Sequence, residues 1–183
     1  MMKPLPEIRI TNIKISGEII GFSENVLQPE NISDLKVGRW RTAFRPIHLH
    51  RMYIFILGKF KNHINITGLT SYNDISKVEE VFSKCCVEGY RCEVDCLRID
   101  SMSFSCRQHI FSHFYRLLKS GNPSFTAGVM NLGWSVRIYP QFPGIVLHID
   151  GPVFTLFRSG CLTGVGFKSY VRFEEALEKL LSL

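Results

Sequence analysis

An internal repeat is the feature of this sequence that most constrains its fold. Phe44 and Phe142 begin two similar heptads, FRPIHLH and FPGIVLH. A spacing of 98 positions is shared by three pairs of landmarks: Phe44 with Phe142, Gly68 with Gly166, and Ser71-Tyr72 with Ser169-Tyr170. One spacing held at three places indicates a duplication, which predicts that the same supersecondary unit occurs twice.

The repeat sets the expected domain organisation. We expect a first repeat at residues 1–89 and a second at residues 90–183. No linker rich in Pro, Gly or Ser separates them, so the two repeats are predicted to form one continuous, pseudo-symmetric domain. The composition, with 45% hydrophobic and 21% charged residues, is typical of a folded protein.

Composition also bears on partners. No run of about 18 apolar residues occurs, so no membrane partner is expected. The first residues, MMKPLPEIRITN, lack the apolar stretch of a secretory signal. The net charge of +6 is spread along the chain and permits a polyanionic partner.

Hydrophobic periodicity predicts the same order of elements in both repeats: a strand, a helical or irregular segment, further strands and a helix. In the first repeat the expected strands are 10–16, 41–50, 52–60 and 63–69, with short helical turns over 24–37 and a helix over 73–86. In the second repeat they are strands 91–99, 134–149, 153–159 and 161–167, with helices 105–121 and 171–183 and an insertion-like loop at 122–133. The predicted fold class is α+β, with a curved antiparallel sheet whose convex face carries the helices and whose other face is open to a partner.

Catalytic and metal chemistry are not indicated. Without a secretion signal, the six cysteines are expected to be reduced and mostly buried. A metal site at Cys92 and Cys96 or at the Cys85–Cys86 pair is the weaker alternative, since no CxxC pair is present. His48 and His50 share a strand face but lack a third ligand at suitable spacing. No phosphate loop and no nucleophile–base arrangement is suggested by local context, so neither an enzyme nor a cofactor is expected.

Several short motifs follow one another in the same order in the two halves. The second has FPG at 142–144, Phe157-x-Ser159-Gly160 and Gly166-x-Lys168; the first has Ile10-x-Asn12-Ile13, Phe44, Phe60 and Thr67-Gly68. In these motifs, residues 8–183 resemble the core domain of the TATA-box-binding protein (TBP) family. The resemblance implies a saddle-shaped sheet. It also implies a transcription initiation factor that binds promoter DNA in the minor groove, bends it by phenylalanine insertion and nucleates the preinitiation complex.

The resemblance assigns roles to individual residues. The intercalating side chains would be Phe44, Phe60, Phe142 and Phe157, for which core packing is the alternative. The minor-groove contacts would be Asn12, Lys14, Asn65, Thr67, Asp95, Leu97, Thr163 and Val165. The phosphate contacts would be Arg41, Arg45, Arg51, Lys59, Lys61, Arg158 and Lys168.

Two departures from the family pattern modify this expectation. Asp95 falls where the second repeat is expected to carry an asparagine, and an ionised carboxylate would be repelled by the acceptors of an A·T pair. No acid precedes the FPG motif, where family members use acidic residues to recruit the general transcription factor TFIIB.

The expected partners are double-stranded promoter DNA and TFIIB-like general transcription factors or RNA polymerase-associated proteins. The divergence favours a viral or deeply divergent member, acting in the nucleus or at a site of viral transcription. The alternative function is that of a TBP-fold protein-interaction scaffold that has lost DNA binding.

Overall fold

The computed structural model describes residues 5–59, 61–90 and 92–183. Its strands are hydrogen-bonded in the order β2-β3-β4-β5-β1-β6-β10-β9-β8-β7. The second half of this order mirrors the first, as a duplication predicts. The strand pairings within each half are antiparallel. The predicted α+β class, with a large antiparallel sheet and helices, is therefore confirmed. No helix of the described residues is long and apolar enough to cross a membrane.

The chain folds as two compact units, and the first residues of the chain belong to the C-terminal unit. The N-terminal unit is Asn12–Asp100, and the C-terminal unit combines Met1–Thr11 with Ser101–Leu183. The strands β1 (Ile8–Ile20) and β6 (Glu93–Arg107) each contribute to both units. The predicted repeat boundary at residues 89 and 90 lies in the connection before β6, whereas the compact units divide within the two strands.

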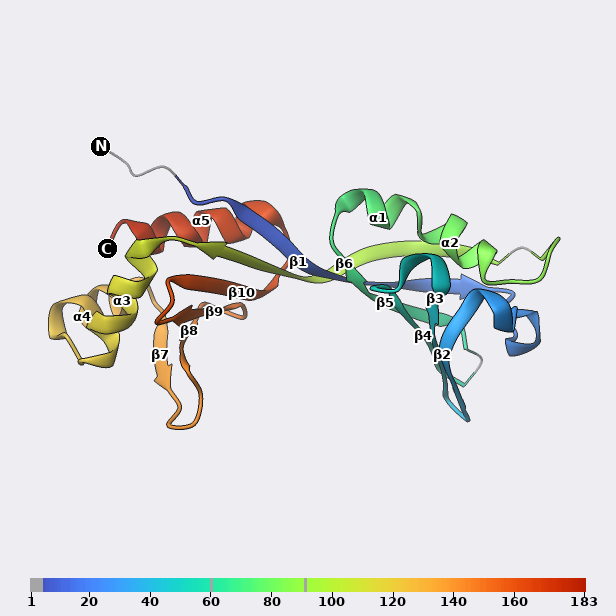
Figure 1. The fold of residues 1–183 in the computed structure, drawn as a ribbon, viewed down its shortest axis with the longest axis horizontal. Helices are drawn as coiled ribbons and strands as arrows, with labels where there is room; N and C mark the ends of the chain where they lie inside the picture. Colours follow the sequence, from blue (N-terminus) through green and yellow to red (C-terminus); the bar gives the residue numbers. More distant parts are fainter. Residues whose placement is uncertain (1–4, 60, 91) are drawn as a thin grey trace. The chain divides into compact units, whose positions relative to one another are not determined.

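In the N-terminal unit, alternating apolar side chains of the strands form the core. The strands besides β1 are β2 (Ile32–Gly38), β3 (Arg41–Pro46), β4 (Tyr53–Leu57) and β5 (His63–Leu69), and short 3-10 turns occupy Glu24–Val26, Pro29–Asn31 and Ile47–Leu49. Ile64 and Ile66 of β5 are fully buried, while the intervening Asn65 is not. The helices α1 (Tyr72–Ser76) and α2 (Val78–Lys84) cover this apolar face (Figure 1).

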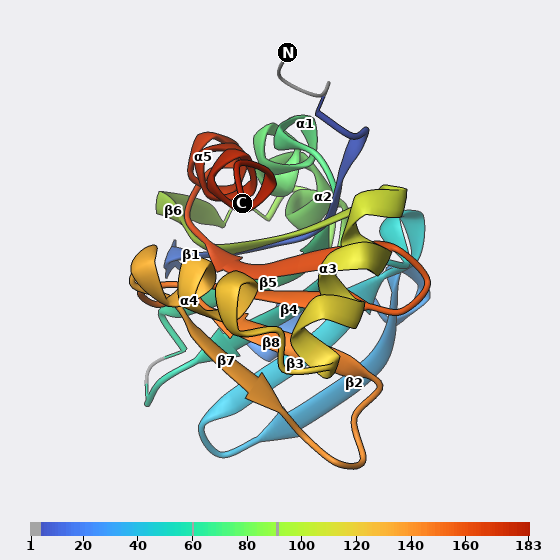
Figure 2. The same ribbon diagram turned by 90° about the vertical axis from the view of Figure 1, so that its left-hand side faces the viewer.

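In the C-terminal unit, an aromatic cluster fills the space between sheet and helices. Its further elements are the helices α3 (His109–Lys119), α4 (Pro123–Asn131) and α5 (Tyr170–Leu181) and the strands β7 (Ser135–Ile138), β8 (Gly144–His148), β9 (Val153–Phe157) and β10 (Cys161–Phe167). The rings of Phe104 and Phe173 stack with centroids 4.4 Å apart, and Phe154 lies 5.4 Å from Phe167. Figure 2, in which this unit faces the viewer, shows the β7–β8 loop extending away from the helices.

Several predicted elements were wrong in type or extent. Residues 122–133 are mainly the helix α4 rather than a loop, because Asn122 accepts a hydrogen bond from the Phe125 amide and Pro123 fits the first helical position. The segment 134–149, predicted as one strand, is the pair β7 and β8 joined by a loop. The strand β2 was missed because an edge strand with six exposed residues carries no alternating pattern.

Each unit presents one sheet face without helices, which we call its open face. For the N-terminal unit, the open face includes Asn12, Lys14, Ser16, Tyr53, Phe55, Asn65 and Thr67, which alternate with buried residues. For the C-terminal unit, it includes Ser101, Ser103, Ser105, Val153, Thr155, Phe157, Thr163 and Val165. Because each unit leaves a face of mixed polarity uncovered, these faces are the natural place to look for a binding site.

Candidate nucleic-acid interface

An exposed aromatic pair lies at the outer hairpins of the C-terminal unit. Phe142, in the β7–β8 loop, is 43% exposed, and its ring packs edge-on against the half-buried Phe157 at the end of β9, with centroids 6.1 Å apart. Gly144 pairs with Phe157 across the sheet. A Cβ atom at Gly144 would lie 2.9 Å from the Phe142 ring and 3.2 Å from the Phe157 ring. The glycine therefore makes room for both rings, which explains the FPG motif.

The amide of Asn12 has a fixed orientation on the open face of the N-terminal unit. Its Oδ1 atom accepts hydrogen bonds from the backbone N–H of Gly68 (2.7 Å) and from the hydroxyl of Thr67 (3.1 Å). Gly68 has a φ of +86°, and a Cβ there would lie 1.7 Å from the Arg51 carbonyl oxygen, so only glycine fits. Since Oδ1 is engaged, the Asn12 side chain presents its NH₂ group, which can only donate.

Strand pairing shows which residues occupy equivalent places in the two units. Gly68 and Gly166 have nearly the same φ, +86° and +88°, so they anchor the comparison of β5 with β10. With that anchor, Ser16 opposite Asn65 corresponds to Ser105 opposite Thr163. The same comparison makes Ser101 the counterpart of Asn12, and Ser103 that of Lys14.

Asp95 and Leu97 were therefore placed in the wrong register. Asp95 lies six residues before Ser101, near the exposed start of β6, where its side chain accepts a hydrogen bond from the Cys96 amide. Leu97 belongs to the N-terminal unit and approaches Gly17, so it does not share a patch with Thr163 and Val165 of the C-terminal unit. The error arose because the strand was predicted to end at residue 99 and the next helix to begin at residue 105, whereas β6 continues to Arg107 and includes Ser101 and Ser103.

Phe44 is a core residue, so the intercalating role predicted for it is wrong. Its side chain has no exposed surface, and its ring lies 6.1 Å from that of Phe82 of α2. Phe44 pairs with Ile54, just as Leu147 pairs with Phe154 in the other unit, so its structural counterpart is Leu147 and not Phe142. Phe60, the second predicted wedge of this unit, lies outside the described residues.

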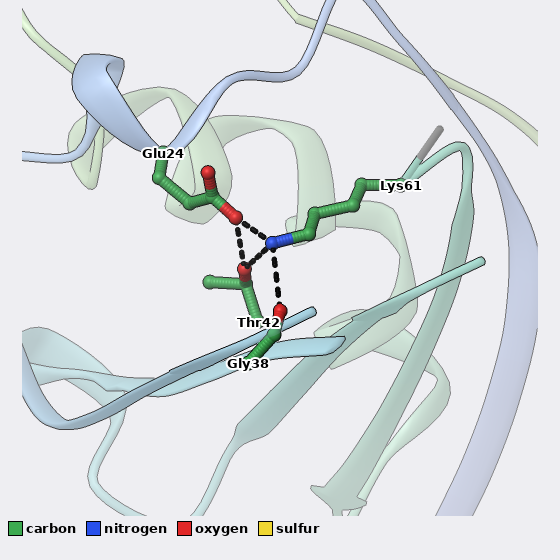
Figure 3. Close-up of polar contacts among 4 residues, drawn as sticks. All are labelled: Glu24, Gly38, Thr42 and Lys61. Carbon is green, nitrogen blue, oxygen red and sulfur yellow. Dashed lines mark hydrogen bonds and ion pairs between the residues drawn. The ribbon is translucent and has the colours of Figure 1, made fainter. Parts of the chain in front are cut away.

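Lys61 is engaged in an internal polar cluster and is not placed to contact phosphate, which corrects the prediction. Its ammonium group forms an ion pair with Glu24 and donates to the Thr42 hydroxyl (3.0 Å) and the Gly38 carbonyl (3.2 Å) (Figure 3). Thr42, which is fully buried, also donates to Glu24 at 2.8 Å. This cluster ties the β2–β3 and β4–β5 hairpins to the turn that follows β1.

The other predicted phosphate contacts differ in their surroundings. Arg45 is partly engaged: it pairs with Asp34 at 2.8 Å, donates to the His50 carbonyl at 3.1 Å and lies 4.7 Å from the Tyr53 ring centroid. The exposed members of the set are Arg41, Arg51, Lys59, Arg158 and Lys168. Arg41 and Arg158 lie at hairpin ends beside the open faces, whereas Lys168 lies two residues before the start of α5.

The cysteines do not form an evident metal centre. Among the described residues, no group of three or more His, Cys, Asp or Glu side chains is arranged to hold a metal ion. Cys85, Cys86, Cys92 and Cys106 are buried, and Cys96 is exposed. Burial raises the pKa of Cys85 to about 11 and that of Cys106 to about 12, so both thiols stay protonated near neutral pH.

Comparison with known proteins identifies the fold. No protein-family model and no curated protein sequence matches the chain. The solved structure of Methanococcus jannaschii TBP matches with a TM-score of 0.69 and 20% sequence identity, over 97% of each chain. The chain has a TBP-like fold. The Rolling Circle Replication Initiator Protein from Geobacillus stearothermophilus also aligns, over 94% of this chain and 78% of that one. Its TM-score of 0.41 and 6% identity are too low to indicate a shared fold.

Sequence reasoning missed several residues of the TBP-like open faces. Ser101 and Ser103 were overlooked for the reason given above. Tyr53 and Phe55, whose rings pack edge-on with centroids 4.6 Å apart, were predicted to lie in a strand but were not assigned to either face of the sheet. The alternation of these two residues with Ile54 and Ile56 was the signal that could have placed them. The hairpin residue Trp40 was also missed, since β2 itself was not predicted.

Proposed function

We propose that this TBP-like chain is a transcription initiation factor that binds double-stranded promoter DNA in the minor groove through its open faces. The observation that carries the proposal is the Phe142–Phe157 pair above Gly144. An apolar pair of this kind, partly exposed at a hairpin end, is suited to insert between base steps and bend the duplex. Unstacking a step costs a few kcal/mol, which is offset by the protein surface that bent DNA can contact.

The polar groups of the open faces support the same interpretation. The NH₂ group of Asn12 matches the acceptors that A·T pairs present in the minor groove, adenine N3 and thymine O2. The half-buried hydroxyls of Ser101 and Ser103, which donate or accept, take the equivalent places in the C-terminal unit. We infer a preference for A·T pairs that is stronger on the N-terminal side than on the C-terminal side.

Bound and bent DNA would then nucleate a preinitiation complex, in the nucleus or at a site of viral transcription. The partners we propose are TFIIB-like general transcription factors or RNA polymerase-associated proteins. In and beside the β7–β8 loop the exposed large apolar side chains are Ile138, Tyr139 and Phe142, and no acid occurs among residues 138–141. A partner that contacts this loop would therefore bind by apolar packing rather than by ion pairing.

The test is a titration of the wild-type protein with duplexes that carry A·T-rich or G·C-rich centres. Donor and acceptor dyes at the duplex ends report bending, and anisotropy reports binding. We expect tighter binding and stronger bending of the A·T-rich duplex, with log K falling by about 0.9 per phosphate contact for each tenfold rise in salt. If neither duplex binds at low salt, the proposal is wrong and the protein-scaffold alternative takes its place.

A further inference from the structure

The two units end their outer hairpins with different aromatic groups. In the N-terminal unit, β2 and β3 are joined by a two-residue turn, and the second residue of this turn is Trp40. The Trp40 side chain is 51% exposed, slightly more than Phe142 in the corresponding β7–β8 loop. An exposed tryptophan at a hairpin tip has no part in the core of its own unit.

Strand register shows that the phenylalanine pair has no direct counterpart in the N-terminal unit. Gly144 pairs with Phe157, and the equivalent pair is Arg41 with Leu57. The residue two positions before Arg41, which corresponds to Phe142, is Arg39. At the described positions equivalent to the pair, this unit therefore has an arginine and a leucine, and the large exposed ring beside them is Trp40.

The surroundings of Trp40 suit contact with a nucleic acid. The Trp40 carbonyl accepts a hydrogen bond from the Gly58 amide at 3.1 Å, which joins the β2–β3 turn to the β4–β5 turn. The Arg39 guanidinium lies 5.3 Å from the centroid of the indole ring. A fixed turn thus presents a broad π-surface with a cation beside it, and bases stack on such surfaces while phosphates attract the cation.

We propose that Trp40 is the base-stacking contact of the N-terminal unit, where a single indole ring takes the place of the phenylalanine pair. This inference rests on the proposed function as a DNA-binding protein and names a residue of that site. The competing interpretation is that the exposed tryptophan contacts a protein partner. The adjacent Arg39 favours the polyanion.

Trp40 is also a convenient probe, because the chain contains two tryptophans. Trp134 is only 6% exposed and packs edge-on against Phe154 at 5.9 Å. The tryptophan fluorescence of a Trp134→Phe variant therefore comes from Trp40 alone, and that of a Trp40→Phe variant comes from Trp134 alone. Both variants are titrated with an A·T-rich duplex, while anisotropy of a labelled copy of that duplex measures binding separately.

We expect DNA to quench the fluorescence of the Trp134→Phe protein with the same midpoint as the anisotropy change, and to leave that of the Trp40→Phe protein unchanged. Trp40→Ala should weaken binding about fivefold or more, and Trp40→Phe should keep most of it. Binding by anisotropy without quenching of Trp40, or loss of bending in Phe60→Ala but not in Trp40→Ala, would overturn the inference and leave the proposed function intact. No binding of either protein by anisotropy would overturn both.

Discussion

At the scale of single residues, strand register decides what a phenylalanine does. Phe44 and Phe142 begin similar heptads, yet Phe44 is fully buried and Phe142 is 43% exposed. Phe44 lies within β3, in phase with Ile54, so its ring points into the core beneath α2. Phe142 precedes β8 and lies in a loop that has no helix over it. Sequence similarity alone does not transfer a role from one position to the other.

This contrast predicts opposite effects on stability. Phe44→Ala should lower the free energy of unfolding by about 3–5 kcal/mol, because it leaves a cavity in a closed core. Phe142→Ala should lower it by less than about 1 kcal/mol, because the ring is partly in solvent and lies outside the core. Urea unfolding of the two variants beside the wild type measures both values, and equal losses would contradict the placement of either residue.

A second residue-scale prediction concerns the donor of Asn12. Asn12→Asp keeps the oxygen that accepts from Gly68 and Thr67 and removes only the NH₂ group, so the fold should survive. The added carboxylate would face base acceptors, and we expect binding of an A·T-centred duplex to weaken by about 1–3 kcal/mol.

The matched control is Asp95→Asn, which makes the opposite change at a position outside the equivalent register. It should leave the preference for central base pairs unchanged in the same binding assay. An Asp95→Asn variant that gains A·T preference, beside an Asn12→Asp variant that loses none, would show that the structural register is misassigned.

At the scale of elements, α1 of the N-terminal unit and α5 of the C-terminal unit each have a serine at the N-cap, but the two serines have different partners. Ser71 accepts a hydrogen bond from the Asp74 amide, and the Asp74 carboxylate accepts from the amides of Ser71 (2.9 Å) and Thr70 (2.8 Å). Ser169 accepts from the amide of Arg172, whose side chain cannot return a bond as an acceptor. The N-terminal unit therefore has a complete capping box, and the C-terminal unit has half of one.

Asp74 makes the stability of the N-terminal unit dependent on pH. Burial raises the pKa of this carboxyl, but hydrogen bonds from Thr70 and Ser71 outweigh burial and hold it below its ordinary value of 3.8. The ionised form therefore stabilises the fold above the unfolded-state pKa, and this contribution is lost as the pH falls through the lowered value. We expect Asp74→Asn to cost about 1 kcal/mol at neutral pH and progressively less below 3.8. Urea unfolding across this range checks it; a constant difference would contradict the assignment.

The sequence predicted elements well where alternation and turn residues agreed. The strand β5 matches its predicted range of 63–69, since buried Ile64 and Ile66 alternate with polar residues and Gly68 must adopt a positive φ. Prediction failed where tertiary context decides: β2 pairs as an exposed edge, and α4 is held by its contacts with α3 and β7. For the site, Phe142 and Phe157 were grouped by the sequence motifs, and their rings lie in contact. The roles predicted for Phe44, Asp95 and Leu97 were wrong, because they depended on strand register.

At the scale of the molecule, equivalent residues of the two units have no single spacing. The spacing between equivalent residues is 98 for Asn65 and Thr163, 100 for Ile54 and Phe154, 103 for Phe44 and Leu147, and 89 for Ile13 and Met102. Loops of different length connect strands that keep their pairing. The two units therefore keep the same strand order and the same alternating burial, although their loops differ in length.

Bending of DNA by insertion of the Phe142–Phe157 pair is the main action that we propose for the C-terminal unit. It is tested most directly by end-to-end energy transfer in an A·T-rich duplex bound by the wild type and by the Phe142→Ala, Phe157→Ala double variant. We predict that the double variant folds, binds more weakly and leaves the duplex close to its unbound length, because a wedge acts only in the complex. A double variant that bends the duplex as the wild type does, or that unfolds because the two rings support the core, would contradict the claim.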